Sequence, residues 1–139
     1  MTIRTMVVED EGLYREMLCL ALNQQPDMQV IYAAEDGASA LQKARELQPD
    51  VILMDIELGS GPNGIETGIA IKEENPKIGI VVLSSHREKQ YIESIPMNIA
   101  GGWSYLLKQS VHDVSSLTRA IQGAMSGLVV IDPQLVMAL

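Results

Sequence analysis

The chain alternates between short apolar runs and longer segments whose apolar residues recur every three or four positions. Runs without polar alternation, such as Val51-Ile52-Leu53-Met54, are typical of parallel strands that helices cover on both faces. Five β-rich runs occur, and a segment with helical character follows each of them. These runs span residues 5–8, 29–33, 51–54, 78–83 and 104–107. The pattern predicts βα repeated five times in an α/β fold with a doubly wound parallel sheet.

The helical segments carry boundary signals of their own. Asp36 is suited to cap the second helix, and the third is expected from Gly64 to Glu74, just before Asn75-Pro76. The fourth, at residues 88–95, has few apolar side chains, and the fifth opens with the capping-box spacing of Ser110 and Asp113. Spacings of three and four predict that the first helix buries Leu13, Met17, Leu20 and Ala21.

The C-terminal residues read as an interrupted element. Residues 128–131 form another apolar run, and Asp132-Pro133 suits the start of a further helix, because Asp caps and Pro fits the first helical position. We expect one domain over residues 1–127 and, over residues 128–139, a linker or a helix start that leads to an output domain absent from this sequence. The alternative is a natural terminal helix that docks on the same domain.

Composition and charge narrow the class of protein. The chain is 47% hydrophobic and 20% charged, and no run approaches the roughly 18 apolar residues of a membrane span. No secretory signal is visible, and the single Cys19 excludes an internal disulfide, so we expect a soluble cytoplasmic protein that makes no membrane contact. A net charge of -8 argues against direct DNA binding, which depends largely on Lys and Arg.

Polar side chains follow four of the predicted strands. The first strand is followed by Glu9-Asp10-Glu11, the third by Asp55, the fourth by Ser84 and the fifth by Lys108. Ligands bind at the carboxyl ends of parallel strands, so these side chains are expected to share one rim. Each acid alone suits a helix cap or a solvated surface, and for Glu11 we favour that interpretation.

Three of these acids predict a metal site. Glu9, Asp10 and Asp55 would repel one another unless a cation or a proton compensates them. Oxygen ligands favour Mg²⁺. The expected inner ligands are Asp10, Asp55 and the backbone carbonyl of Glu57, with Glu9 acting through water.

The same rim suits phosphoryl chemistry. A carboxylate whose charge a metal offsets can attack phosphorus in a donor with a good leaving group, and Asp55 is placed for that role. Lys108 would supply an ammonium charge to the attached phosphoryl group, and Ser84 a hydroxyl donor. A solvated lysine and a helix-capping serine are the plain alternatives for these two residues.

In order and spacing, the segments at residues 7–11, 51–55, 81–85 and 105–108 resemble the receiver domains of two-component response regulators. The resemblance covers nearly the whole chain and implies the five-stranded (βα)5, flavodoxin-like receiver fold. The stretch from Gly102 to Asp132-Pro133 looks most like the NarL/LuxR branch, which normally joins its receiver to a helix-turn-helix DNA-binding domain.

The resemblance also implies roles and partners. It makes Asp55 the phosphoacceptor of a sensor histidine kinase or a small phosphodonor, with catalysis limited to the chain's own phosphorylation and dephosphorylation. It further implies homodimerisation on phosphorylation and DNA contact only through the output domain. The remaining roles would be the acidic pair Glu9 and Asp10, the switch hydroxyl Ser84, the phosphate partner Lys108 and the switch aromatic Tyr105, for which core packing is an equal alternative.

Three departures from the family pattern stand out. The loop at residues 56–64 lacks the usual Met-Pro step and has one extra residue before Gly64. Gln109 replaces the Pro that often follows the lysine, and Ser84 replaces the frequent Thr. We hypothesise that Glu57 and His86, two residues beyond Asp55 and Ser84, tune dephosphorylation. Their alternative is two exposed side chains, and an unchanged phosphate lifetime in Glu57→Ala and His86→Ala would contradict the hypothesis.

Three rival functions remain open from the sequence. An aspartyl-nucleophile Mg²⁺ phosphohydrolase is suggested by Asp55-Ile56-Glu57, although such enzymes carry the nucleophile on their first strand. A flavin-binding module of similar architecture would need a phosphate loop where this chain has acids. A degenerate receiver would bind partners without phosphorylation. In the favoured interpretation, phosphorylation draws Ser84 toward Asp55 and repacks the face built by the fourth helix, fifth strand and fifth helix.

Overall fold

The computed structural model describes residues 2–85 and 101–136. The fourth helix predicted at residues 88–95 and the side chain of His86 lie outside the described residues. Within that part of the chain, no helix is both long and apolar enough to cross a membrane.

The described residues form a parallel sheet of six strands in the order β2-β1-β3-β4-β5-β6. Every neighbouring pair of strands is parallel, so the predicted doubly wound sheet is confirmed. The five predicted strands are all present, and a short sixth strand adds to them. The strands are β1 (Ile3–Val8), β2 (Met28–Ala34), β3 (Val51–Asp55), β4 (Gly79–Ser84), β5 (Trp103–Leu107) and β6 (Val129–Ile131).

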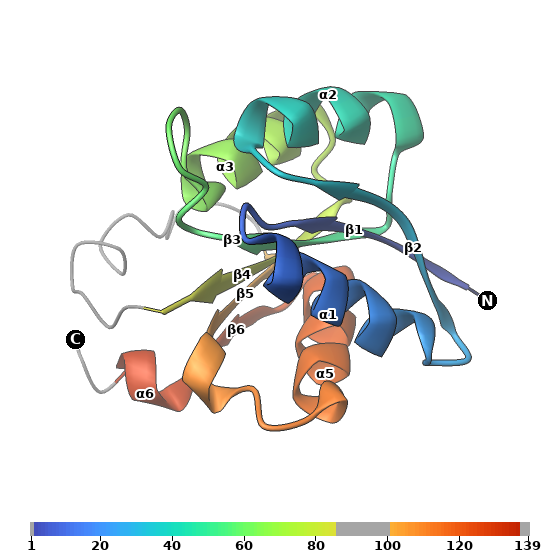
Figure 1. The fold of residues 1–139 in the computed structure, drawn as a ribbon, viewed down its shortest axis with the longest axis vertical. Helices are drawn as coiled ribbons and strands as arrows, with labels where there is room; N and C mark the ends of the chain where they lie inside the picture. Colours follow the sequence, from blue (N-terminus) through green and yellow to red (C-terminus); the bar gives the residue numbers. More distant parts are fainter. Residues whose placement is uncertain (1, 86–100, 137–139) are drawn as a thin grey trace.

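Helices cover both faces of this sheet (Figure 1). The first face carries α1 (Gly12–Asn23) and α5 (Val114–Met125), and the second carries α2 (Gly37–Leu47) and α3 (Gly64–Glu74). The α3 bounds agree with the prediction, and Asn63 and Glu66 form a capping box there. The Asp36 cap on α2 is confirmed by its 2.8 Å bond from the Ser39 N–H. Asp113, not Ser110, caps α5, because Ser110 belongs to the short 3₁₀ helix η1 (Lys108–Ser110).

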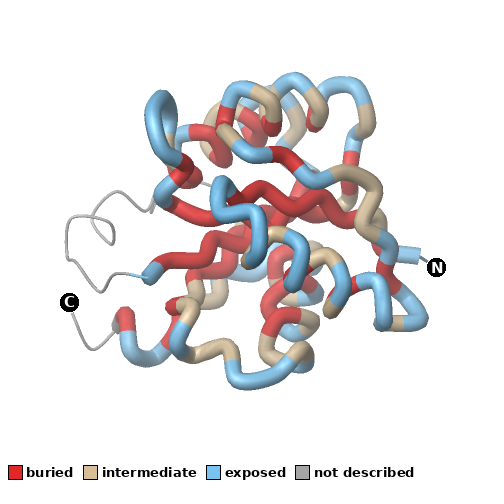
Figure 2. The backbone as a smooth tube through the Cα atoms, in the orientation of Figure 1, coloured by how far each residue is buried: buried red, intermediate tan, exposed pale blue. Residues whose placement is uncertain are grey.

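The core consists of two apolar layers, one on each face of the sheet. Figure 2 shows that the central strands are buried along most of their length. Successive residues of a strand point to opposite faces, so the central strands must be apolar throughout. In β3, Val51 and Leu53 pack toward α1 and α5, whereas Ile52 and Met54 pack toward α2 and α3. This explains why the strand runs show no polar alternation.

The predicted buried face of α1 is wrong. Leu13, Met17 and Leu20 are 82%, 50% and 61% exposed, and Ala21 is half-buried. The buried positions are Leu18 and Leu22, which pack on the sheet beside α5. This helix carries apolar residues around most of its circumference, so spacing alone predicts more than one stripe, and packing against the sheet selects between them.

The C-terminal segment lies along the free edge of β5. Strand β6 pairs with β5 from Trp103 to Tyr105, and Leu135 in helix α6 (Pro133–Val136) is buried in the core. Asp132 lies between β6 and α6 and bonds to the backbone of β5. Its N–H donates to the Tyr105 carbonyl at 2.8 Å, and its carboxylate accepts from the Leu107 N–H at 3.0 Å.

We expect Asp132→Ala to lower the free energy of unfolding by about 1–3 kcal/mol, because the buried Leu107 N–H would lose its acceptor. Urea unfolding monitored by circular dichroism measures the change. Asp27→Ala is the matched control, since Asp27 is exposed. Equal stability of the two variants would contradict this role for Asp132.

Candidate functional site

Three carboxylates meet at the carboxyl ends of β1 and β3, as predicted. One oxygen from each of Glu9, Asp10 and Asp55 lies within 4.8 Å of the others. The meeting follows from topology, because β1 and β3 are neighbouring parallel strands. Glu9 and Asp55 are 1% and 7% exposed, whereas Asp10 faces solvent. The acid cluster, defined as these three residues, therefore holds two of its carboxylates away from water.

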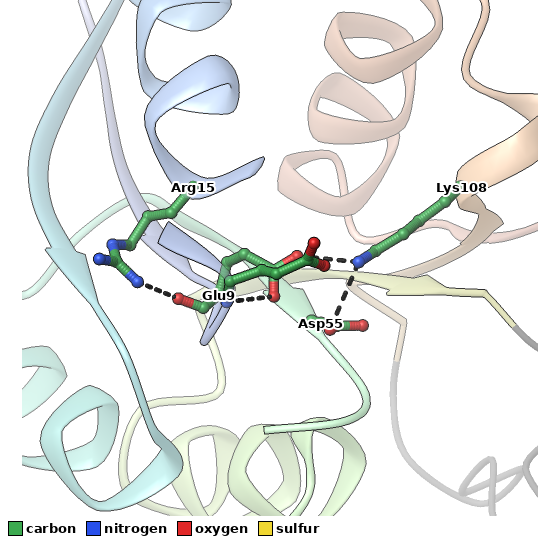
Figure 3. A network of polar contacts seen from close by, with 5 residues as sticks. Glu9, Arg15, Asp55 and Lys108 are labelled. Carbon is green, nitrogen blue, oxygen red and sulfur yellow. Dashed lines mark hydrogen bonds and ion pairs between the residues drawn. The ribbon is translucent and has the colours of Figure 1, made fainter. Parts of the chain in front are cut away.

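Lys108 contacts two members of the acid cluster from the end of β5 (Figure 3). Its ammonium nitrogen lies 2.8 Å from Glu9 Oε1 and 3.5 Å from Asp55 Oδ2. The predicted approach of Lys108 to Asp55 is thus present, but the closer partner is Glu9. Within residues 2–85 and 101–136, Lys108 is the cation that pairs with the acid cluster, and it pairs with two of the three acids.

Burial, together with the neighbouring charges, shifts the pKa values of the site. Burial raises the pKa of Glu9 to about 7, and the Asp55 charge adds to the rise while Lys108 opposes it. Burial likewise raises the pKa of Asp55, against the opposing charge of Lys108. Burial lowers the pKa of Lys108, but its bond to Glu9 and the charges of both acids outweigh that effect and raise it overall. The two buried acids therefore favour either a proton or an added cation.

Two site residues were missed by sequence reasoning, and both lie in the first turn of α1. The Arg15 guanidinium donates to the Glu9 carbonyl at 2.7 Å and pairs with Glu35 at 3.3 Å. The ring of Tyr14 lies under Lys108, with 4.2 Å between the ammonium nitrogen and the ring centroid. No spacing signal identifies either residue, because each contact depends on how α1 turns back over the end of β1.

Ser84 and Tyr105 occupy different environments. Ser84 ends β4, is 4% exposed, and pairs in register with Leu107, directly before Lys108. Tyr105 is 2% exposed, and its ring stacks on Trp103 with 5.8 Å between the centroids. Among the described residues, the Tyr105 hydroxyl has no hydrogen-bond partner, and burial raises its pKa. In this structure Tyr105 is a core residue, which agrees with the packing alternative.

The loop after Asp55 has a defined path despite its extra residue. Ile56 and Leu58 are buried, while Gly59 and Gly61 adopt positive φ angles of 78° and 92° that favour glycine. A Cβ at Gly64 would collide with the Asp55 carbonyl, so only glycine lets α3 begin this close to β3.

The same loop borders a groove of about 410 Å³ beside the acid cluster, lined in part by Asp10, Glu57 and Asn63. The backbone N–H of Glu57 hydrogen-bonds to the Asp55 carboxylate, and the Glu57 side chain is exposed. The groove therefore opens beside Asp10, the exposed member of the acid cluster.

Proteins of known family resemble this chain in sequence and in fold. A family model described as the response regulator receiver domain matches residues 5–132. The oxygen regulatory protein NreC of Staphylococcus carnosus is 30% identical over 137 residues, which cover 99% of this chain and 61% of NreC. The chain thus spans about three-fifths of that relative's length.

Two solved structures illustrate the similarity. The receiver domain of the response regulator NarL from Mycobacterium tuberculosis is 26% identical, with a TM-score of 0.74 over 88% of this chain and 98% of that one. The alignment with a structure of RcsB dimers bound to DNA covers all of this chain and 68% of the RcsB chain, with a TM-score of 0.81. At 18% identity, the RcsB match shows a shared fold alone.

Proposed function

The chain belongs to the response regulator receiver family, in its NarL/LuxR branch, and on that premise we propose that Asp55 accepts a phosphoryl group and thereby switches the domain. The observation that carries this proposal is the convergence of the acid cluster and Lys108 beside an open groove. Receiver domains of this family are signalling proteins, and the reaction proposed here modifies the chain itself.

The acid cluster fits Mg²⁺. All of its donors are oxygens, and burial raises the pKa of two of its carboxylates, Glu9 and Asp55, so a bound cation would stabilise their charged forms. Asp10, Asp55 and the Glu57 carbonyl would hold the ion directly, and Glu9 would act through water. The bound ion would offset the charge of the nucleophile and of the phosphoryl oxygens.

The chain's own groups would carry the transfer. An Asp55 carboxylate oxygen attacks phosphorus, a new P–O bond forms, and the bond to the imidazole of a phosphohistidine or to acetate breaks. Lys108, already 3.5 Å from Asp55, pairs with a phosphoryl oxygen, and the Ser84 hydroxyl donates to another. Glu57 and His86 would set how long the phosphoryl group lasts, and the exposure of Glu57 at the groove supports its part in this.

Partners and domain organisation extend the same proposal. A sensor histidine kinase would supply the phosphoryl group. On this chain, the surface that binds the kinase would include the exposed Leu13, Met17 and Leu20 of α1, which begins two residues after Asp10. The receiver of residues 1–127, extended by β6 and α6 on its sheet, would precede a helix-turn-helix output domain that contacts DNA. Phosphorylation would promote homodimerisation; RcsB, a protein of the same fold, forms dimers on DNA. A net charge of -8 supports DNA contact through the output domain rather than the receiver.

Intact-mass measurement after incubation with acetyl phosphate and Mg²⁺ tests the proposal. We expect one phosphoryl adduct per chain, and none when EDTA removes the metal. Absence of the adduct at every Mg²⁺ concentration would favour a degenerate receiver. Continuous release of product from a phosphate ester, with no adduct, would favour the phosphohydrolase.

Mg²⁺ affinity is expected to fall by up to about tenfold between pH 7 and pH 6, since one proton must leave before the metal enters. The pKa of Glu9 is raised to about 7, so this carboxyl binds a proton below that pH in the metal-free protein and releases it above. Isothermal titration calorimetry across this range measures the effect. Glu9→Gln should flatten the dependence, and an equally steep dependence in that variant would contradict the assignment to Glu9.

A further inference from the structure

Among the described residues, the ammonium group of Lys108 has contacts with two acids and one aromatic ring. Glu9 and Asp55 accept from it at 2.8 Å and 3.5 Å, and the third neighbour is the ring of Tyr14 at 4.2 Å from its centroid. An ammonium group has three N–H donors. The two carboxylates accept hydrogen bonds from some of these donors, and the Tyr14 ring covers another side of the ammonium group.

The contact has the geometry of a cation–π interaction. The face of an aromatic ring carries partial negative charge and attracts a cation within about 6 Å of its centroid. The side chain of Lys108 is only 19% exposed, and Tyr14 is half-buried, so water screens this attraction less than it would on an open surface. The ring therefore holds the ammonium group as well as shielding it.

The neighbouring residue fixes the place of the ring. Arg15 ties the first turn of α1 to the end of β1 through its 2.7 Å bond to the Glu9 carbonyl. It also pairs with Glu35 beyond β2. Tyr14 precedes Arg15 in the same turn, so the position of its ring is set relative to the acid cluster and not only by contact with Lys108.

We propose that Tyr14 is a positioning residue, whose ring holds the Lys108 ammonium group over the acid cluster for the incoming phosphoryl group. This inference rests on the proposed function. Lysine is a point charge on a flexible four-carbon stem, so without a lateral contact it samples water and other partners. The ring restricts that motion without adding a negative charge, which would compete with the phosphoryl oxygens for the ammonium group.

The kinetic test compares Tyr14→Leu with Tyr14→Phe. Initial rates of adduct formation are measured by intact mass with acetyl phosphate at saturating Mg²⁺. Tyr14→Leu is expected to be slower by roughly three- to tenfold, the range that such an attraction supplies, whereas Tyr14→Phe keeps the ring and stays within about twofold of the native rate. The calorimetric Mg²⁺ affinity is expected to stay unchanged in both, since the ring supplies none of the proposed metal ligands.

Tyr32→Leu is the matched control. The Tyr32 ring also lies beneath a lysine, with 5.1 Å between Lys43 Nζ and the ring centroid. Tyr32 lies on β2, away from the acid cluster. This control is expected to phosphorylate at the native rate. A native rate in Tyr14→Leu, or an equal slowing in Tyr14→Leu and Tyr14→Phe, would overturn the proposal.

A double-mutant cycle separates positioning from general packing. Urea unfolding of the native chain, Tyr14→Leu, Lys108→Met and the double variant reports whether the ring and the ammonium group interact. We expect Tyr14→Leu to shift the unfolding equilibrium constant by about threefold more in the native background than in Lys108→Met. Equal shifts in both backgrounds would overturn the proposal. Failure of the native chain to form an adduct would instead reject the proposed function, which this cycle does not measure.

Discussion

Asp55→Asn is expected to take up no phosphoryl group from acetyl phosphate and, without divalent ions, to be more stable than the native chain. The first effect follows because a carboxamide lacks the nucleophilic oxygen that the transfer needs. The second follows because Asp55 is 7% exposed and burial raises its pKa, so its charge is costly in the folded state. Lys108 keeps its closer partner, Glu9, at 2.8 Å.

Two measurements check this prediction. Intact mass should show a complete loss of the adduct, and urea unfolding in EDTA at about pH 8 should show a gain on the order of 1 kcal/mol. Asp27→Asn, at an exposed position, is the matched control and should behave as the native chain. An adduct that persists in Asp55→Asn would identify a different phosphoacceptor.

Lys108→Met is expected to slow adduct formation by roughly a hundredfold, because it removes the preplaced cation that pairs with the phosphoryl oxygens. Methionine keeps the length and the apolar stem of lysine, so the loss is mainly one of charge. Initial rates with acetyl phosphate at saturating Mg²⁺, measured by intact mass, provide the comparison. Lys77→Met is the control, because Lys77 is exposed.

The same variant is expected to lose stability with rising pH more steeply than the native chain. Lys108 lowers the pKa of both Glu9 and Asp55, so its removal raises their folded-state values further. Carboxyl groups with raised pKa values stabilise the fold while protonated and lose that contribution as pH rises through the folded-state pKa. Urea unfolding in EDTA from about pH 5 to pH 8 tests this. If Lys108→Met forms the adduct at the native rate and has the native pH profile, the proposed role of Lys108 is contradicted.

The sheet was predictable because its strands are unusually uniform. Residues such as Ile52 and Met54 point to one face and Leu53 to the other, and all are apolar because helices cover both faces. The sixth strand was not identified, because residues 129–131 form a short run whose partner at the edge of β5 is set by the complete fold. The apolar run alone predicts a linker or the start of a helix, not a strand of the sheet.

The first helix shows where periodicity fails. Leu13, Met17 and Leu20 share helical spacing, as do Leu18 and Leu22, and the helix buries the second set. Spacing measures the angle between side chains and not which direction faces the sheet. The distinction depends on how the chain enters α1, which the Arg15 bond to the Glu9 carbonyl helps to fix.

The candidate site divides in the same way. Glu9, Asp10, Asp55 and Lys108 were predicted to converge because each follows a parallel strand, and in the structure they do. Tyr14 could not be predicted from the sequence, because its contact is with an ammonium group that is distant along the chain. Strand ends can be derived from a sequence pattern, whereas a lateral contact from a neighbouring helix requires coordinates.

The central claim, that Asp55 accepts the phosphoryl group, is tested most directly by locating the modification. The chain is incubated with acetyl phosphate and Mg²⁺, and borohydride then reduces any acyl phosphate to the alcohol, which tandem mass spectrometry assigns to a residue. We predict reduction at Asp55 alone, and no reduction when Mg²⁺ is replaced by EDTA. Reduction at Asp10, Glu9 or Glu57 in place of Asp55 would contradict the account.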